Sequence, residues 1–267
     1  MPARIAKGKP HSQVLTMEEQ ALLCFMKEFH INPTDTILFL YKELASKTGD
    51  QKERKALTQR FFDALGPLYD DLRFFLSIMT DLPEDKRREL IVESVDKYAA
   101  SGCPTVLEVG AGTGHITSGI LGITKRDPKC VSLDISSSML NSTAAKLRSL
   151  SRYDRFFPIR ADGEKVPIHT SSVDAVILSY VLEYSENPNL LLEDALRVLK
   201  PQGILLLLTA IYDHEGAQEL SLPQTFSAEY IMQLLKNLKH TSNYEIEVKS
   251  NPSANTLLLV LRKLAVK

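Results

Sequence analysis

Residues 105–114 constrain the fold of this chain more than any other stretch. Their sequence is TVLEVGAGTG, in which a short apolar run is followed by three glycines at alternate positions. The apolar run predicts a buried strand, and the apolar pattern that resumes over residues 116–123 predicts a helix. A strand, a glycine turn and a helix in this order bring backbone N–H groups close to a ligand. The turn is therefore the first candidate binding site.

Two nucleotide-binding patterns come close to this glycine spacing. The dinucleotide fingerprint G-x-G-x-x-G requires a glycine at position 115, where this chain has His115. The observed spacing is G-x-G-x-G, and the acid Glu108 stands two residues before the first glycine, Gly110. This pattern resembles motif I of the class I S-adenosylmethionine (SAM) methyltransferases. A glycine turn without a ligand would explain the motif only if it stood alone.

Further stretches are similar to signatures of that family, and they come in the family's order. Ahead of motif I, residues 61–65 (FFDAL) and the Tyr69-Asp70 pair resemble a signature of its small-molecule members. After motif I, residues 174–184 resemble the fourth motif, whose strand end lies beside the transferable group. Residues 195–203 resemble the helix–turn–strand signature that follows. The commoner form of that signature has glycine where Gln202 stands, a change that we expect to alter the turn locally and leave the function intact.

The resemblance implies SAM as the cofactor, and it assigns roles to individual residues. Asp134 ends the strand after the glycine loop, where an acid can accept hydrogen bonds from both ribose hydroxyls. Met139 stands where the family packs an apolar side chain on adenine. Asp162 stands where an acid accepts from the adenine amino group, and Gly163 lets the chain approach the base. The cofactor-binding residues expected on this basis are Tyr69, Glu108, Gly110, Gly112, Asp134, Ile135, Met139, Asp162, Gly163 and Ser179.

Two tyrosines are the candidate catalytic residues. Tyr69 belongs to the pair that covers the methionine end of the cofactor in the resembled family, and Tyr180 follows the fourth predicted strand. An aromatic face can stabilise a sulfonium by cation–π attraction, worth about 0.5–2 kcal/mol. The alternative for Tyr69 is an amphipathic core aromatic, and the alternative for Met139 is plain core packing.

The order of predicted elements indicates a doubly wound α/β fold in the second part of the chain. Strands alternate with helices over residues 104–267, and the resemblance implies a seven-stranded sheet of order 3-2-1-4-5-7-6 with the ligand at the strands' carboxyl ends. Residues 1–103 contain no predicted strand. They contain five amphipathic helical segments, which end near Asn32, Thr48, Leu65, Met79 and Ala100. None would be stable alone, so we expect them to form a lid on the SAM-binding core.

Composition excludes several classes of partner. The 32 basic and 33 acidic side chains nearly cancel, so no strong field for nucleic acid is expected. No apolar run reaches the roughly 20 residues that span a bilayer. The three cysteines lack zinc or disulfide spacing, as in a reduced, cytoplasmic protein. We expect a monomer or a homodimer without a metal.

The acceptor is less constrained than the cofactor. The Asn-Pro-Pro-Tyr sequence of many amide and base methylases is absent, because its position reads Ser-Tyr-Val-Leu over residues 179–182. A neutral chain with a helical lid instead indicates a small molecule of metabolism or natural-product biosynthesis. Three hypotheses remain open: methyl transfer to an O, N or C atom of a small metabolite, cyclisation of SAM to azetidine-2-carboxylate and methylthioadenosine, and SAM binding without catalysis.

Overall fold

A computed structural model of the protein describes residues 49–67, 69–70, 84–99, 102–211, 224, 226–238, 243–249 and 256–264. All of these belong to one structural unit, residues 34–267. The expected helices that end near Asn32 and Thr48 lie outside the described residues. So does the helix expected at 68–79, apart from Tyr69 and Asp70.

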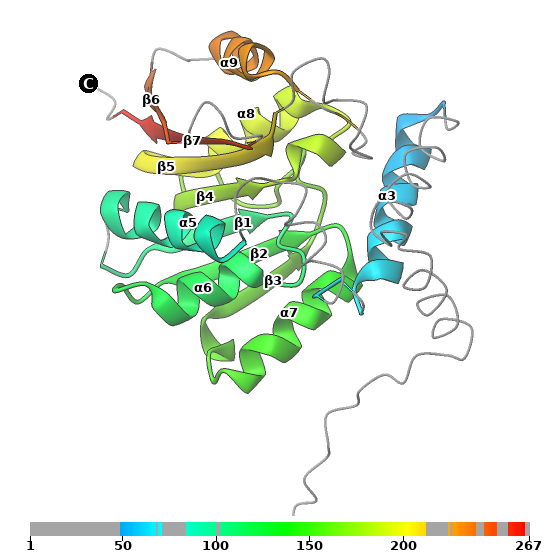
Figure 1. Ribbon diagram of the computed structural model, residues 1–267, viewed down its shortest axis with the longest axis vertical. Helices are drawn as coiled ribbons and strands as arrows, with labels where there is room; N and C mark the ends of the chain where they lie inside the picture. The colour runs from blue at the N-terminus through cyan, green and yellow to red at the C-terminus, as the bar shows by residue number, and fades with distance from the viewer. Residues whose placement is uncertain are drawn as a thin grey trace, which may run out of the picture. The chain divides into compact units, whose positions relative to one another are not determined.

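Seven strands of the described chain form one sheet, in the predicted order β3-β2-β1-β4-β5-β7-β6 (Figure 1). The strands β1 to β5 are parallel, whereas β7 runs antiparallel to β5 and to β6. Their bounds are β1 Thr105–Val109, β2 Lys129–Asp134, β3 Phe156–Arg160, β4 Val173–Ser179, β5 Leu199–Ala210, β6 Tyr244–Val248 and β7 Thr256–Lys263. This order confirms the fold class predicted from the sequence.

Helices connect and cover the strands. They are α3 Gln51–Leu65, α5 Glu84–Tyr98, α6 His115–Ile123, α7 Ser137–Ser149, α8 Pro188–Val198 and α9 Ala228–Asn237, with short 3₁₀ turns η1 Tyr153–Arg155 and η2 Leu182–Tyr184. Several of these helices begin at a residue whose side chain accepts a hydrogen bond from a backbone N–H of the first turn. Ser136, for example, accepts a hydrogen bond from the Met139 N–H and so begins α7. Among the described residues, no helix is long and apolar enough to cross a membrane.

Both faces of the sheet are buried, as parallel sheets require. On one face, Val176 and Leu178 of β4 pack with residues of α8 and α9, such as Leu192 and Ile231. On the other face, neighbouring β4 residues pack with residues of α5, α6 and α7. The alternation along β4 explains why the sequence shows an unbroken apolar run there. The loops that follow the strands at their carboxyl ends are consequently the natural place for a site.

The start of β5 differs from the expected turn. The signature over residues 195–203 predicts a turn between helix and strand, but β5 begins at Leu199, directly after α8, and its pairing with β4 jumps from Leu199 to Ile204. Gln202 within this jump has a φ of 65°, the left-handed conformation that glycine adopts most easily. The backbone therefore keeps the conformation that glycine favours at this position, even though the residue is a glutamine.

Candidate functional site

The glycine loop between β1 and α6 forms the floor of the candidate site. Gly110, Gly112 and Gly114 all have positive φ, at 68°, 52° and 77°. A Cβ at Gly110 would lie 2.3 Å from a Val181 methyl group, and one at Gly114 would lie 2.4 Å from a Thr143 methyl group. A Cβ at Gly112 would meet no heavy atom within 4 Å. Close packing therefore requires the outer two glycines, whereas the backbone of Gly112 is open on that side.

Asp134 lies directly beside this loop, at the end of β2. Its carboxylate accepts a hydrogen bond from the Gly112 N–H at 2.8 Å and another from the Ser136 N–H at 2.8 Å. The side chain is buried, and this burial raises its pKa. Each carboxylate oxygen retains a lone pair for a further donor. The structure thus brings Gly112 and Asp134 together, as the sequence predicts.

The start of α7 places Ile135 and Met139 next to Asp134. Met139 is 1% exposed, whereas Ile135 is half-buried and its carbonyl accepts a hydrogen bond from Arg160 Nε at 3.3 Å. Met139 is therefore packed in the interior, and Ile135 is the more exposed apolar side chain beside Asp134.

The end of α3 packs on the start of α7. Asp63 accepts hydrogen bonds from Ser136 Oγ at 2.7 Å and from the Ser138 N–H at 3.2 Å. A Cβ at Gly66 would lie 2.3 Å from Ser138 Oγ, so the two helices approach closely. Asp63 lies within the FFDAL signature, but its contact with a residue 73 positions away has no local signal in the sequence. That signature joins α3 to the loop that carries Asp134.

The Tyr69-Asp70 pair lies beside the glycine loop. Asp70 accepts a hydrogen bond from Thr113 Oγ1 at 2.5 Å and forms an ion pair with Lys146 at 3.0 Å. Lys146 also donates to the Thr113 carbonyl at 2.9 Å. Tyr69 is half-buried. Asp70 thus ties this pair to Thr113 of the glycine loop and to Lys146 of α7.

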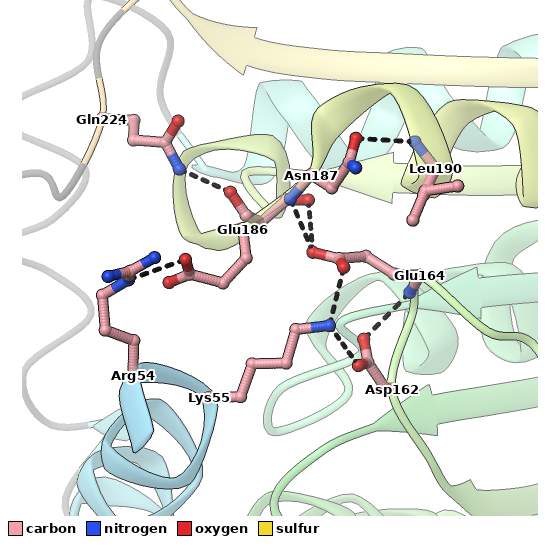
Figure 2. Close-up of polar contacts among 9 residues, drawn as sticks. Arg54, Lys55, Asp162, Glu164, Glu186, Asn187, Leu190 and Gln224 are labelled. Atoms are coloured by element: carbon pink, nitrogen blue, oxygen red, sulfur yellow. Dashed lines mark hydrogen bonds and ion pairs between the residues drawn. The ribbon is translucent and has the colours of Figure 1, made fainter. Parts of the chain in front are cut away.

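Asp162 and Gly163 follow the carboxyl end of β3, at the same edge of the sheet as Asp134 at the end of β2. A Cβ at Gly163 would lie 2.6 Å from a methyl group of Val109, the last residue of β1, so glycine permits this approach. The Asp162 carboxylate accepts a hydrogen bond from the Glu164 N–H at 2.9 Å and forms an ion pair with Lys55 of α3 at 2.5 Å (Figure 2). Lys55 is 107 residues from Asp162 and belongs to no motif of the sequence, so this contact was not predicted.

The α3 helix also contacts the segment after β4. Arg54 forms an ion pair with Glu186 at 2.7 Å (Figure 2), and the ring of Phe62 packs edge-on against Tyr184 at a centroid distance of 5.0 Å. Together with the contacts at Asp63 and Lys55, these place α3 against the loops that follow β2, β3 and β4. One face of this short helix therefore borders all three.

The end of β4 carries Ser179 and Tyr180. Ser179 is half-buried. Tyr180 has a φ of 52°, its hydroxyl lies 3.1 Å from Thr256 Oγ1, and the Arg87 guanidinium lies 4.9 Å from its ring centroid. The ring that we expected to face a sulfonium thus already has a protein cation over it. This contact locates Tyr180 against α5.

Two buried glutamates lie near the strand ends: Glu108 in β1 and Glu183 in the turn η2 after β4. Glu108 of β1 accepts a hydrogen bond from the Thr117 hydroxyl of α6, and burial raises its pKa to about 8. Glu183 accepts from Thr209 Oγ1 and from the Ala210 N–H through one oxygen, while its other oxygen has no hydrogen-bond partner among the described residues. Glu108, expected at the cofactor, thus has its carboxylate directed at α6.

Comparison with known proteins agrees with this geometry. Residues 107–207 match the model of a family described as a methyltransferase domain. Over these residues the chain is similar to the class I SAM-dependent methyltransferases. The matched segment runs from β1 into β5, so it contains the glycine loop, Asp134 and Asp162.

This chain matches relatives with assigned activities over only part of their length. A malonyl-[acyl-carrier protein] O-methyltransferase of Methylovorus sp. (strain MP688) is 30% identical over 158 residues, which are 58% of this chain and 50% of that protein. The ubiquinone/menaquinone biosynthesis C-methyltransferase UbiE of Syntrophotalea carbinolica (strain DSM 2380 / NBRC 103641 / GraBd1) is 30% identical over 151 residues, 57% of this chain and 60% of that protein. The chain thus spans about half to three fifths of these relatives.

Solved structures share the fold at low identity. A SAM-dependent methyltransferase from Aquifex aeolicus has a TM-score of 0.53 at 18% identity, over 66% of this chain and 89% of that one. The [4+2]-cyclase SpnF has a TM-score of 0.58 at 16% identity, over 76% of this chain and 97% of that one. These likenesses support the fold class.

The residues present fit the cofactor of the methyltransferase family, SAM. The open backbone at Gly112 and the free lone pairs of Asp134 offer room and acceptors for a ribose. Ile135 supplies a half-buried apolar side chain, and Asp162 supplies a further acceptor that is 36% exposed. Among the described residues, no group of His, Cys, Asp and Glu side chains could hold a metal ion.

Proposed function

We propose that this protein transfers a methyl group from SAM to an O, N or C atom of a small metabolite. The observation that carries the proposal is the hydrogen bond from the Gly112 N–H to Asp134 at 2.8 Å. It joins the glycine loop to the strand-end acid, the two features that a nucleoside site of this family needs. Residues 1–103 act in this proposal as a lid over the core of residues 104–267.

The residues around the loop take distinct roles. SAM supplies an electrophilic methyl group on a sulfonium. Asp134 accepts hydrogen bonds from the ribose hydroxyls, and Gly110 and Gly112 let the backbone approach the cofactor. Ile135 and Met139 pack against the adenine, and Asp162 accepts from its amino group beside Gly163. Tyr69 and Ser179 border the methionine end, and Glu108 supports the loop from beneath through Thr117.

Catalysis then depends mainly on placement. Methyl transfer requires an acceptor atom in line with the methyl–sulfur bond and shielded from water. The contacts of α3 with the loops after β2, β3 and β4 support such a shield. Tyr69 and Tyr180 are the candidates to stabilise the sulfonium or to orient the acceptor.

A small acceptor is supported by the sequence at the end of β4 and by the relatives. Residues 179–182 lack the Asn-Pro-Pro-Tyr sequence of many base and amide methylases. The two relatives described above are named for malonyl-[acyl-carrier protein] and for quinone biosynthesis. Cys130 is a buried free thiol, which supports our placement of the protein in the cytoplasm. We propose a monomer or homodimer.

Mass spectrometry of the reaction products tests the proposal. The protein is incubated with SAM carrying a deuterated methyl group, with and without a small-molecule extract. We expect S-adenosylhomocysteine, together with a deuterium-labelled small molecule that forms only when the extract is present. Methylthioadenosine with azetidine-2-carboxylate in the absence of extract would instead show cyclisation of SAM. Unchanged SAM under both conditions would contradict catalysis.

A further inference from the structure

Lys55 lies between two carboxylates of the loop that follows β3. Its Nζ lies 2.5 Å from Asp162 Oδ2 and 2.6 Å from Glu164 Oε2 (Figure 2). The side chain of Glu164 is 6% exposed, whereas those of Lys55 and Asp162 are 26% and 36% exposed. The ammonium therefore neutralises a partly buried pair of acids, and these acids raise the pKa of Lys55 against the opposing effect of burial.

Glu164 extends this contact to the segment after β4. Its Oε1 accepts a hydrogen bond from Ser185 Oγ at 2.9 Å. It also accepts one from the Asn187 N–H at 2.9 Å (Figure 2). Asn187 in turn caps α8, because its side chain accepts from the Leu190 N–H at 3.2 Å. One lysine thus ties α3 to the loop after β3 and, through Glu164, to the segment that leads into α8.

The Asp162 carboxylate is fixed on two sides. One oxygen accepts from the Glu164 N–H at 2.9 Å, and the other binds Lys55. Each oxygen keeps a lone pair for one more donor. Without the ammonium, Asp162 and Glu164 would be two like charges two residues apart, and the more exposed Asp162 would turn towards water. The orientation of Asp162 therefore depends on Lys55.

We propose that Lys55 is a positioning residue for the nucleobase end of the cofactor site. It holds Asp162 so that the carboxylate accepts from an exocyclic amino group on a purine, and it thereby sets specificity for adenine over hypoxanthine. This inference rests on the proposed function, in which Asp162 faces the adenine. Lys55 touches no reacting atom and acts only through Asp162, so its effect falls on recognition of the base.

Calorimetry with two nucleosides measures this effect. S-adenosylhomocysteine carries the amino group, and S-inosylhomocysteine has a carbonyl oxygen in its place, which Asp162 would repel. For the unaltered protein we expect S-adenosylhomocysteine to bind about tenfold tighter or more, the ratio that a hydrogen bond to a charged group produces. In Lys55→Met the ratio should fall below about threefold, chiefly because S-adenosylhomocysteine binds more weakly.

Arg54→Met is the matched control. Arg54 is the neighbouring cation of α3 and pairs with Glu186, but neither Asp162 nor Glu164 is its ion-pair partner. If Lys55 only anchored α3, Lys55→Met and Arg54→Met should change the ratio of the two nucleoside affinities equally. Our proposal instead predicts that Arg54→Met leaves this ratio unchanged. Lys55→Arg keeps the charge with a different reach, so its ratio should be intermediate. If circular dichroism shows that Lys55→Met is unfolded, Lys55→Arg replaces it in the comparison with Arg54→Met.

Asp162→Asn separates this proposal from the proposed function. The amide can donate to the hypoxanthine carbonyl, so the ratio should fall or invert. If Asp162→Asn behaves so and Lys55→Met keeps the original ratio, the role of Lys55 is overturned and the cofactor site stands. If Asp162→Asn keeps the original ratio, or the unaltered protein shows no preference, Asp162 does not read the base and Lys55 cannot position it. If S-adenosylhomocysteine does not bind at all, the proposed function itself fails.

Discussion

At the scale of single residues, buried carboxylates determine how this fold responds to pH. Burial raises the pKa of Glu108, Asp134 and Glu183. An acid whose pKa is higher in the folded chain holds its proton longer there than in the unfolded chain. Its contribution to stability is therefore greatest at low pH and is lost as the pH rises through the folded-state pKa.

Glu108→Gln tests this behaviour. The pKa of Glu108 rises from 4.5 to about 8, so ionisation destabilises the folded state progressively between these values. The slope approaches about 1.4 kcal/mol per pH unit within that window. A glutamine cannot ionise, so the stability of the variant relative to the unaltered protein should increase from pH 5 to pH 8. Urea unfolding at several pH values measures the difference, and a constant difference would contradict it.

Tyr69 and Tyr180 are separated by substitutions that keep or remove the ring. If a ring face stabilises the sulfonium, Tyr→Phe should be mild, and Tyr→Ala should slow the reaction by the equivalent of about 0.5–2 kcal/mol. If a hydroxyl orients the acceptor, phenylalanine should be nearly as damaging as alanine. For Tyr180, phenylalanine also removes the hydroxyl contact with Thr256. Single-turnover rates at saturating SAM distinguish these roles, and unaltered rates in all four variants would exclude both.

Local residues of the site were predictable, and long-range partners were not. The glycines, Asp134 and Asp162-Gly163 follow predicted strands, so the sequence indicates both their place and their chemistry. Lys55 is separated from Asp162 by 107 residues, and nothing in the composition of α3 distinguishes it from the other cations there. The direction of Glu108 towards Thr117 was likewise outside the reach of a motif.

At the scale of elements, the turn at the start of β5 contains Gln202 where the family's signature more commonly has glycine. Gln202 adopts the left-handed conformation, and Gly203 after it must be small, because a Cβ there would lie 2.9 Å from the Lys200 carbonyl oxygen. The hydrogen-bonded pairing on either side of residues 200–203 holds the backbone in place.

Gln202→Gly should therefore stabilise the protein. A left-handed residue other than glycine costs about 1–2 kcal/mol, and the greater freedom of glycine in the unfolded chain offsets roughly 0.5–1 kcal/mol of this. We expect a net gain of up to about 1 kcal/mol in the free energy of unfolding. Gln202→Ala is the control, because alanine relieves no strain and should give no gain. Destabilisation by glycine would show that the side chain of Gln202 stabilises the turn.

At the scale of the whole molecule, α3 packs against the loops that follow β2, β3 and β4, near the glycine loop. The fold class followed from the alternation of strands and helices, whereas the sheet order followed from the family resemblance, and the structure has that order. Which loops α3 would border could not be predicted, because each of its contacts joins residues far apart in sequence. The Asp63, Lys55 and Arg54 contacts span 73, 107 and 132 residues.

The central claim, a SAM site built on the glycine loop and Asp134, is tested most directly by calorimetric titration with SAM and with NAD. We expect the unaltered protein to bind SAM in preference to NAD. Asp134→Ala should weaken SAM binding by about 1–3 kcal/mol, because buried donors lose their acceptor. Asp134→Asn, which keeps one acceptor oxygen, should lose less, and circular dichroism checks that both variants are folded. Unchanged SAM affinity in Asp134→Ala, or binding of NAD in place of SAM, would contradict the account.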